Sequence, residues 1–260
     1  MPLLPGAEPY HHRGGPTGVL LCHGFTGSPQ GLRPWAEFLA AAGLTVSLPL
    51  LPGHGTRWQD LGVTRWEDWY AEVSRELGRL LGQCERVFVF GLSMGGGLAL
   101  KLAADHGEEV AGVVVVNPSV RSDNPAAPLL PVLRHLVPSV PGIGGDIADP
   151  DARELGYDRI PLDAAWSLNR FWHEVRRALP SVRQPVLLLR SPQDHVVSPA
   201  NSALVLARIS SVDVTERLCE QSFHVATLDR DAELIFEESL GFVRRLTGVA
   251  QPAAATDQRG

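Results

Sequence analysis

Short apolar runs alternate along the chain with longer segments in which apolar residues recur every three or four positions. Unbroken apolar runs at 18–24, 87–90 and 110–117 predict strands that are buried on both faces of a sheet. Helical spacing at 66–81 and 231–246 predicts amphipathic helices between and after them. This order predicts an α/β fold with a mostly parallel central sheet and helices on both faces.

The alternation breaks after residue 117. The following stretch is rich in proline and small residues and shows no clear strand, and a strand pattern returns only at PVLLLR, 185–190. We interpret the stretch as a cap inserted into the core, and we expect the end of the chain to be disordered. The predicted division is a core formed by residues 1–117 and 171–248, a cap formed by residues 118–170, and a tail formed by residues 249–260.

Composition narrows the class of protein. The chain has 260 residues, of which 44% are hydrophobic and 20% are charged, as in an ordinary globular domain, and no apolar run reaches membrane-spanning length. The net charge of −6 argues against nucleic acid as a partner. Cysteines 22, 84 and 219 lack metal-type spacing, and the N-terminus lacks a secretory pattern. We therefore expect a cytoplasmic monomer or homodimer without an integral membrane span.

The sequence GLSMG, residues 91–95, places a serine between two glycines where a predicted strand passes into a predicted helix. G-x-S-x-G in this setting is typical of a nucleophile elbow, a tight turn that presents the serine oxygen at the carboxyl edge of a sheet. Bulky side chains two positions either side would collide with neighbouring backbone, so glycine is expected at Gly91 and Gly95. Ser93 is therefore the candidate nucleophile.

A serine nucleophile requires a histidine to accept its proton and an acid to orient that histidine. Asp194 follows the predicted strand 185–190 in the sequence SPQD, so it reaches the same sheet edge. The other common position for the acid, after strand 110–117, holds Asn117, which cannot carry the negative charge. The alternative for Asp194 is a loop residue that caps the next turn.

His224 is the candidate base among nine histidines, because it follows the last predicted strand. His195 adjoins Asp194, and neighbouring side chains point apart, so His195 is a poor partner for that carboxylate. His23 and His54 lie in glycine-flanked turns, where packing or a backbone hydrogen bond is the expected role. The order serine, aspartate, histidine is the order typical of a nucleophile elbow and not of trypsin-like enzymes.

Acyl transfer also needs donors for the negative oxygen of the intermediate. The backbone N–H of Met94 is one candidate, and the N–H of Phe25 in HGFTG, residues 23–27, is the other. We expect Gly24 and Gly27 to let this loop approach the serine. The alternative is that HGFTG is a simple strand-to-helix turn.

Together the segments HGFTGSP, PGHG, GLSMGG, SPQD and SFH resemble the α/β-hydrolase superfamily, more narrowly small bacterial carboxylesterases and monoacylglycerol lipases, over residues 15–248. The resemblance implies Ser93 as nucleophile, His224 as base, Asp194 as acid, and Phe25 with Met94 as oxyanion donors. It also implies a cap between the sixth and seventh strands. Phe223 stands where these enzymes often have glycine. We expect either another loop path or a ring that lines the pocket.

The expected reaction is two-step hydrolysis of short- to medium-chain aliphatic esters or monoacylglycerols without metal or organic cofactor. The alternatives are a thioesterase or another serine acyl hydrolase, and a catalytically silent ligand-binding protein on the same fold. Apolar residues of the cap either shield an acyl chain or only pack the cap onto the core. These residues are Leu129, Leu130, Leu133, Leu136, Val137 and Ile143.

Overall fold

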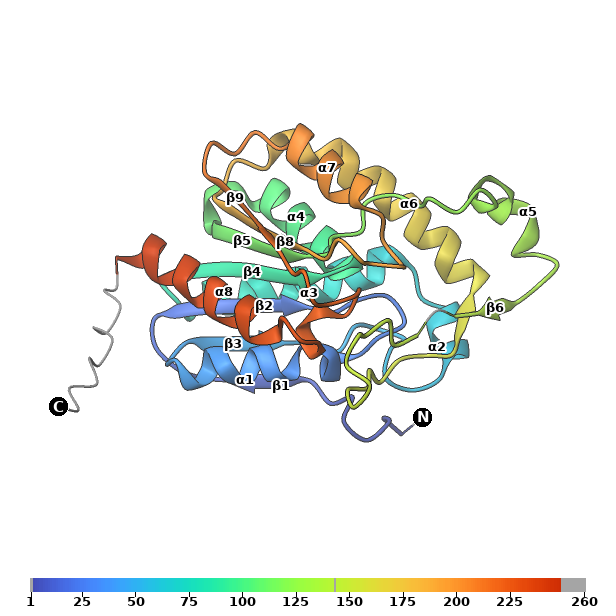
Figure 1. Cartoon of the computed structure of the whole chain (residues 1–260), viewed down its shortest axis with the longest axis horizontal. Helices are drawn as coiled ribbons and strands as arrows, with labels where there is room; N and C mark the ends of the chain where they lie inside the picture. The colour runs from blue at the N-terminus through green and yellow to red at the C-terminus, as the bar shows by residue number, and fades with distance from the viewer. Residues whose placement is uncertain (1, 143, 249–260) are drawn as a thin grey trace.

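A computed structural model of the chain describes residues 2–142 and 144–248 (Figure 1). A seven-stranded sheet has the order β1-β3-β2-β4-β5-β8-β9. Its strands are β1 (Tyr10–His12), β2 (Thr17–Cys22), β3 (Thr45–Leu48), β4 (Arg86–Leu92), β5 (Val110–Val116), β8 (Val186–Arg190) and β9 (Val214–Leu218). The expected tail, 249–260, lies outside the described residues.

All neighbouring strands of this sheet run parallel except β1, which pairs antiparallel with β3 at one edge. The predicted mostly parallel sheet is confirmed. The sequence pattern missed β1, because a three-residue strand with two exposed side chains carries no hydrophobic periodicity.

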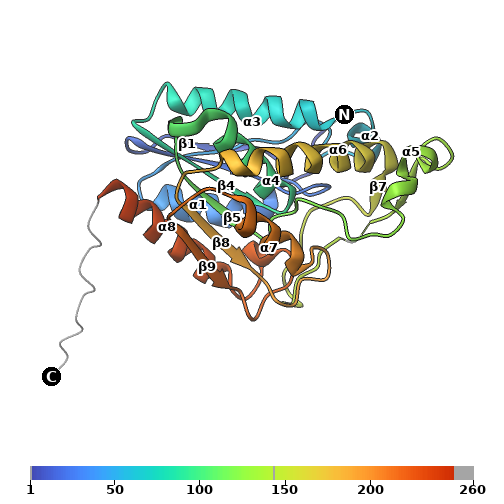
Figure 2. The same cartoon turned by 90° about the horizontal axis from the view of Figure 1, so that it is seen from above.

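Helices cover both faces of the sheet, as Figure 2 shows from above. Side chains of α1 (Arg33–Ala41) and α8 (Ala232–Thr247) join the hydrophobic cluster on one face. Side chains of α3 (Trp66–Leu81), α4 (Met94–His106), α6 (Leu162–Ala178) and α7 (Pro199–Arg208) join the cluster on the other face. The predicted arrangement of helices on both faces is confirmed.

Strand β5 shows why its sequence is apolar at nearly every position. Val113 and Val115 pack in the cluster beneath α3 and α4, whereas Val114 and Val116 pack in the cluster beneath α1 and α8. Alternate side chains of a strand point to opposite faces, so a strand covered on both faces needs apolar residues throughout. The central strands therefore hold the two layers together.

Helix α3 begins at Trp66, where the helical spacing predicts it. The Asp68 carboxylate accepts the Arg65 N–H at 2.8 Å. The Thr64 hydroxyl donates to the Leu61 carbonyl and accepts the Trp69 indole N–H instead of capping the helix. The sequence TRWE, residues 64–67, has the Thr-x-x-Glu form of a capping box, but Arg65 and Asp68 make the capping contacts in its place.

The chain between β5 and β8 forms the layer at the carboxyl ends of the strands. It contains α5 (Leu130–Leu133), the two-stranded sheet of β6 (Ser139–Pro141) and β7 (Arg159–Pro161), and α6; the remaining helix, α2 (Trp58–Gly62), lies beside β7. Both views place α5 at the end of the molecule beyond the sheet (Figures 1 and 2).

Three expectations concern this insertion, and the structure differs from the first two. The insertion follows the fifth strand of a seven-stranded sheet, not the sixth. It contains β6 and β7 where no strand was expected, because three-residue strands leave no pattern. The expected boundary at 170 falls inside α6, and the division into core and cap stays a prediction.

No helix in the described part of the chain is long and apolar enough to cross a membrane.

Candidate active site

Ser93 occupies the turn between β4 and α4 with φ 57° and ψ −120°. Two glycines permit this turn. A Cβ atom on Gly91 would lie 2.1 Å from the Gly95 carbonyl oxygen, and one on Gly95 would lie 1.9 Å from the Cys22 carbonyl oxygen. No side chain fits at either position, so the strained backbone at Ser93 depends on both glycines.

A cavity of about 520 Å³ opens above Ser93, between the carboxyl ends of the strands and the inserted segment. The core contributes lining residues Phe25, Met94 and His224, and the insertion contributes Leu130, Leu133 and Trp172. Ser93 lines this cavity, although the residue as a whole is only 9% exposed. This shape suits a largely apolar molecule with one polar reacting group.

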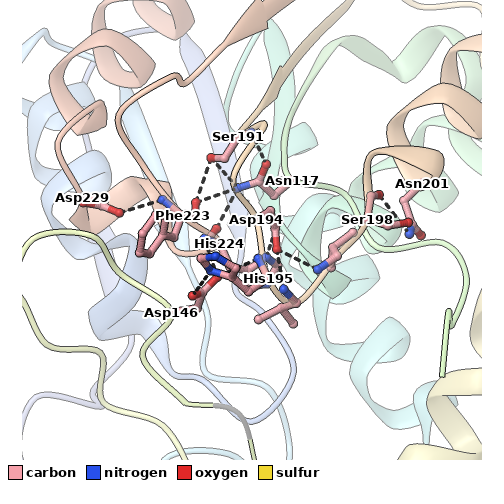
Figure 3. Close-up of polar contacts among 12 residues, drawn as sticks. Asn117, Asp146, Ser191, Asp194, His195, Ser198, Asn201, Phe223, His224 and Asp229 are labelled. Atoms are coloured by element: carbon pink, nitrogen blue, oxygen red, sulfur yellow. Dashed lines mark hydrogen bonds and ion pairs between the residues drawn. The ribbon is translucent and has the colours of Figure 1, made fainter.

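The Asp194 carboxylate and the His224 ring form a close pair (Figure 3), and His224 lines the cavity. Asp194 Oδ2 lies 2.7 Å from His224 Nδ1. The Asp194 side chain is only 2% exposed, and its Oδ1 accepts the N–H groups of Val196 and Val197 at 2.8 and 2.7 Å. These donors fix the carboxylate, which in turn orients the imidazole with Nδ1 directed away from the cavity.

The structure brings Ser93, Asp194 and His224 to one site, although 131 positions separate the first from the last along the chain. Ser93 and His224 line the same cavity. Among residues 2–142 and 144–248 no hydrogen bond joins their side chains. The hydrogen bond between a nucleophile and its base is often long or poorly aligned before substrate binds and tightens afterwards.

Asn117 occupies the position considered for the acid. It instead holds the loop that carries Phe223 and His224, called the histidine loop below. It follows β5 with φ 43°, and its amide nitrogen donates to the carbonyl oxygens of His224 and Phe223 at 2.8 and 3.3 Å. Its amide oxygen accepts the Ser191 N–H at 2.7 Å, and the Ser191 hydroxyl also donates to the Phe223 carbonyl. An uncharged amide is suited to this role because it both donates and accepts.

Phe223 follows the first of the two expected departures and not the second. Its φ is not among the positive values of the described residues, so the loop follows a path that phenylalanine tolerates. The ring packs edge-on against His195 at 4.6 Å between centroids and does not line the cavity. The first of the two expectations, another loop path, is therefore the one the structure shows.

Phe25 of the HGFTG loop and Met94 both line the cavity. A Cβ on Gly24 would lie 3.6 Å from Ser93 Cβ, whereas one on Gly27 would lie 2.9 Å from Glu154 Oε1. The loop is therefore close to the serine at its start and close to the insertion at its end.

His23 anchors this loop to the segment that follows β3. The Leu51 N–H donates to His23 Nε2 at 3.1 Å, so the ring proton is on Nδ1, which donates to the Gly24 carbonyl at 2.9 Å. Burial lowers the pKa of His23 to about 4, so the ring is neutral near pH 7. The expected role of His23, packing with a backbone hydrogen bond, is confirmed.

His54 packs behind the same loop. Its ring lies edge-on to His23 and to Trp69, with centroids 5.0 and 5.8 Å apart, and Nδ1 donates to the Pro52 carbonyl. Burial, with a smaller contribution from His23, lowers the pKa of His54 to about 3. The expected packing role is confirmed here as well, since neither histidine lines the cavity.

Glu154 is a cavity residue that the sequence analysis missed. It comes from the insertion, and burial raises the pKa of its carboxyl, while the His224 ring and the Gly145 N–H act in the opposite direction. A single glutamate in a proline-rich stretch carries no motif. Only the fold of the insertion brings it to the cavity.

The six apolar residues of the insertion divide into two groups and one residue that the structure leaves out. Leu130 and Leu133 line the cavity. Leu129, Leu136 and Val137 are 58%, 72% and 41% exposed and do not line it. Ile143 lies outside the described residues. Of the six, Leu130 and Leu133 are the described residues placed where they could shield an acyl chain, and that role stays a prediction.

The His, Cys, Asp and Glu side chains of the described residues were candidates for a metal site. Among the residues with described placement, no group of three or more His, Cys, Asp or Glu side chains is arranged to hold a metal ion. Cys22, Cys84 and Cys219 are free thiols, and burial raises the pKa of each, most strongly for Cys22.

Residues 17–231 match the serine aminopeptidase S33 family. The chain is 42% identical to the thermostable monoacylglycerol lipase of Bacillus sp. (strain H-257), over 95% of this chain and 98% of that protein. It is 24% identical to a carboxylesterase of Bacillus subtilis (strain 168), over 92% and 97%. A solved structure from work on the metagenome-derived lipolytic enzymes LipS and LipT has a TM-score of 0.91 and 40% identity, covering 94% of this chain and 100% of that one.

The parallel sheet, the strand–serine–helix turn and the buried carboxylate–imidazole pair define an α/β hydrolase. The chain belongs to the serine aminopeptidase S33 family within that fold. The resemblance that the sequence motifs suggested is confirmed at this level. The family name does not fix the substrate, because the relatives above are named as lipases and an esterase.

Proposed function

We propose that the protein is a serine hydrolase of short- to medium-chain aliphatic esters or monoacylglycerols. The observation that carries the proposal is the buried Asp194–His224 pair, 2.7 Å apart, at the edge of the cavity into which Ser93 opens. The relatives named as monoacylglycerol lipase and carboxylesterase support the same class of substrate.

In the proposed reaction Ser93 attacks the acyl carbon while His224 Nε2 accepts the hydroxyl proton. Asp194 keeps the ring in the tautomer that leaves Nε2 free, because Nδ1 donates to Oδ2. The N–H groups of Phe25 and Met94 stabilise the negative oxygen, and each such donor is worth about 3 to 4 kcal/mol in the transition state.

The first step ends when His224 gives its proton to the departing alcohol and the acyl-enzyme forms. In the second step, which releases the acid, a water loses a proton to His224 and attacks the acyl-enzyme. The water adds to the acyl carbon, the bond to Ser93 breaks, and the serine recovers its proton. We assign no metal or organic cofactor to either step.

The insertion supplies the proposed binding surface for the acyl chain. Leu130 and Leu133 form an apolar wall together with Trp172 of α6, and we propose that residues 118–170, which include the two leucines, act as the cap. Glu154 places a carboxyl group on the same cavity, beside Gly27, where it can bind a hydroxyl of the alcohol part of the substrate. Work in the cytoplasm as a monomer or homodimer also remains part of the proposal.

The test is a substrate panel assayed with wild type and Ser93→Ala. It contains monoacylglycerols, p-nitrophenyl esters of increasing chain length and the corresponding acyl thioesters. We expect ester hydrolysis by wild type and a loss of about 10⁴-fold or more in Ser93→Ala. Preference for thioesters over esters would favour the thioesterase alternative, and undiminished turnover in Ser93→Ala would overturn the assignment.

A further inference from the structure

One carboxylate of the insertion touches both loops that carry the acid–base pair. Asp146, in the segment between β6 and β7, is well buried, with 12% of its side chain exposed. Its Oδ2 accepts two backbone N–H groups, those of His195 and His224, each at 3.1 Å (Figure 3). A single oxygen atom therefore joins the loop that carries Asp194 and His195 to the loop that carries His224.

These two N–H groups lie next to the catalytic pair, whose side chains must keep their relative position. His195 directly follows Asp194, and the second donor belongs to His224 itself. The side chains of Asp194 and His224 meet at 2.7 Å on the other side of the same junction. Asp146 thus ties the two backbones together where the two side chains pair.

Three further hydrogen bonds hold the insertion to His224's neighbours along the chain, Val225 and Asp229. The Val225 N–H donates to the Asp146 carbonyl at 3.1 Å. The Asp229 carboxylate accepts the Phe223 N–H at 2.9 Å and also the N–H groups of Ala148 and Asp149, at 2.7 and 3.0 Å. The segment around Asp146 is therefore bonded directly to His224, Val225 and Asp229, and Asp229 in turn holds the Phe223 N–H.

We propose that Asp146 is a positioning residue, through which the inserted segment fixes the geometry of the Asp194–His224 pair. The inference rests on the proposed function. Without the carboxylate, two N–H groups in a half-buried junction lose their acceptor, and the two loops lose their shared contact. Small displacements of a catalytic pair cost about 10²-fold in rate.

The competing account is that Asp146 only pairs with the His195 ring, whose Nδ1 lies 2.8 Å from Asp146 Oδ1. His195 is 61% exposed at its side chain, so this contact is largely at the surface. His195→Ala removes the ring but keeps both backbone donors. It therefore separates the surface pair from the backbone junction.

The experiment compares variants on p-nitrophenyl acetate, whose acyl group is too short to need the apolar wall. Asp146→Ala is expected to lower kcat about 10- to 100-fold with KM within about twofold. Asp146→Asn is expected to recover most of kcat, because one amide oxygen can accept both N–H groups. His195→Ala and the exposed control Asp151→Ala are expected to stay within about threefold of wild type.

Melting curves accompany each variant, and Asp146→Ser replaces Asp146→Ala if the latter does not fold, with the same expected loss. The inference is overturned if kcat of Asp146→Ala stays within twofold, if KM rises in place of the loss in kcat, or if asparagine fails to rescue. It is also overturned if His195→Ala reproduces the full loss. Wild type and Ser93→Ala in the same assay test the proposed function separately, since an inactive wild type contradicts that function and an active one does not.

Discussion

Asp194 Oδ2 lies 2.7 Å from His224 Nδ1, and the other oxygen of the same carboxylate accepts the N–H groups of Val196 and Val197. The two oxygens are therefore not interchangeable. The oxygen held by the backbone donors must remain an acceptor, and the oxygen that faces the ring determines which ring nitrogen carries the proton.

Asp194→Asn is expected to reverse this assignment. The backbone donors retain the amide oxygen, so the amide nitrogen faces His224 Nδ1 and donates to it. The ring then carries its proton on Nε2 and cannot accept the proton of Ser93, which should lower kcat by about 10⁴-fold. Steady-state kinetics on a medium-chain ester measures the loss, and a variant within tenfold of wild type would contradict the assigned role of Asp194.

Gly95→Ala tests the elbow. A methyl group there would lie 1.9 Å from the Cys22 carbonyl oxygen, so α4 and β2 would have to separate. We expect the free energy of unfolding to fall by about 3 kcal/mol and activity to be lost. Urea unfolding and kinetics measure the two effects.

Gly78→Ala is the matched control for Gly95→Ala. Gly78 lies within α3, and a Cβ there would meet nothing within 4 Å. Alanine is the better helix former, so this variant should be more stable than wild type by about 0.5 to 1 kcal/mol with unchanged kinetics. Equal destabilisation by both variants would show that the argument from close approach is wrong.

His54→Phe tests the pH dependence of stability. Burial lowers the pKa of His54 from 6.5 to about 3, so between these values the unfolded chain binds a proton that the folded protein does not. The free energy of unfolding therefore falls as pH drops below 6.5, by about 2 kcal/mol for this group at pH 5. His23 contributes in the same direction.

Phenylalanine keeps the ring that packs on Trp69 but does not titrate. The melting temperature of His54→Phe should fall less between pH 7 and pH 5 than that of wild type. The exposed His173 offers a control, since His173→Gln should leave the wild-type slope in place. Parallel slopes for wild type and His54→Phe would contradict a neutral buried imidazole.

Leu133→Trp tests whether α5 borders the acyl chain. An indole at this cavity-lining position fills space that a longer chain would need. We expect kcat/KM to fall about tenfold or more for long-chain esters and to change little for acetate. Leu136→Trp, at a side chain that is 72% exposed, should leave the chain-length profile unaltered. A uniform loss on all esters would point to a general disturbance of the cap.

The parts of this protein that the sequence predicted are those whose signal is local. Strand β5 is apolar because both of its faces are covered, and the glycines around Ser93 are needed because neighbouring backbone lies too close for a side chain. Both features can be recognised from a few consecutive residues. The same reasoning places Asp194 and His224 after strands of one parallel sheet, so their carboxyl ends meet at one edge.

The features that sequence reasoning missed depend on contacts across the fold. Asp146 and Glu154 lie in a proline-rich segment without periodicity, and only the path of the insertion brings them to the histidine loop and the cavity. Leu130 and Leu136 have similar sequence surroundings, yet one lines the cavity and the other is exposed. Composition alone does not distinguish them, because the turns of a short helix and the strands β6 and β7 set which side faces inward.

The most direct measurement of the central claim is covalent labelling with a fluorophosphonate probe, followed by mass spectrometry of the digested protein. An activated serine should carry one adduct at Ser93, with no labelling of Ser93→Ala and strongly slowed labelling of His224→Ala. An unlabelled Ser93 in a wild-type protein that hydrolyses esters, or an adduct at another serine, would contradict the account.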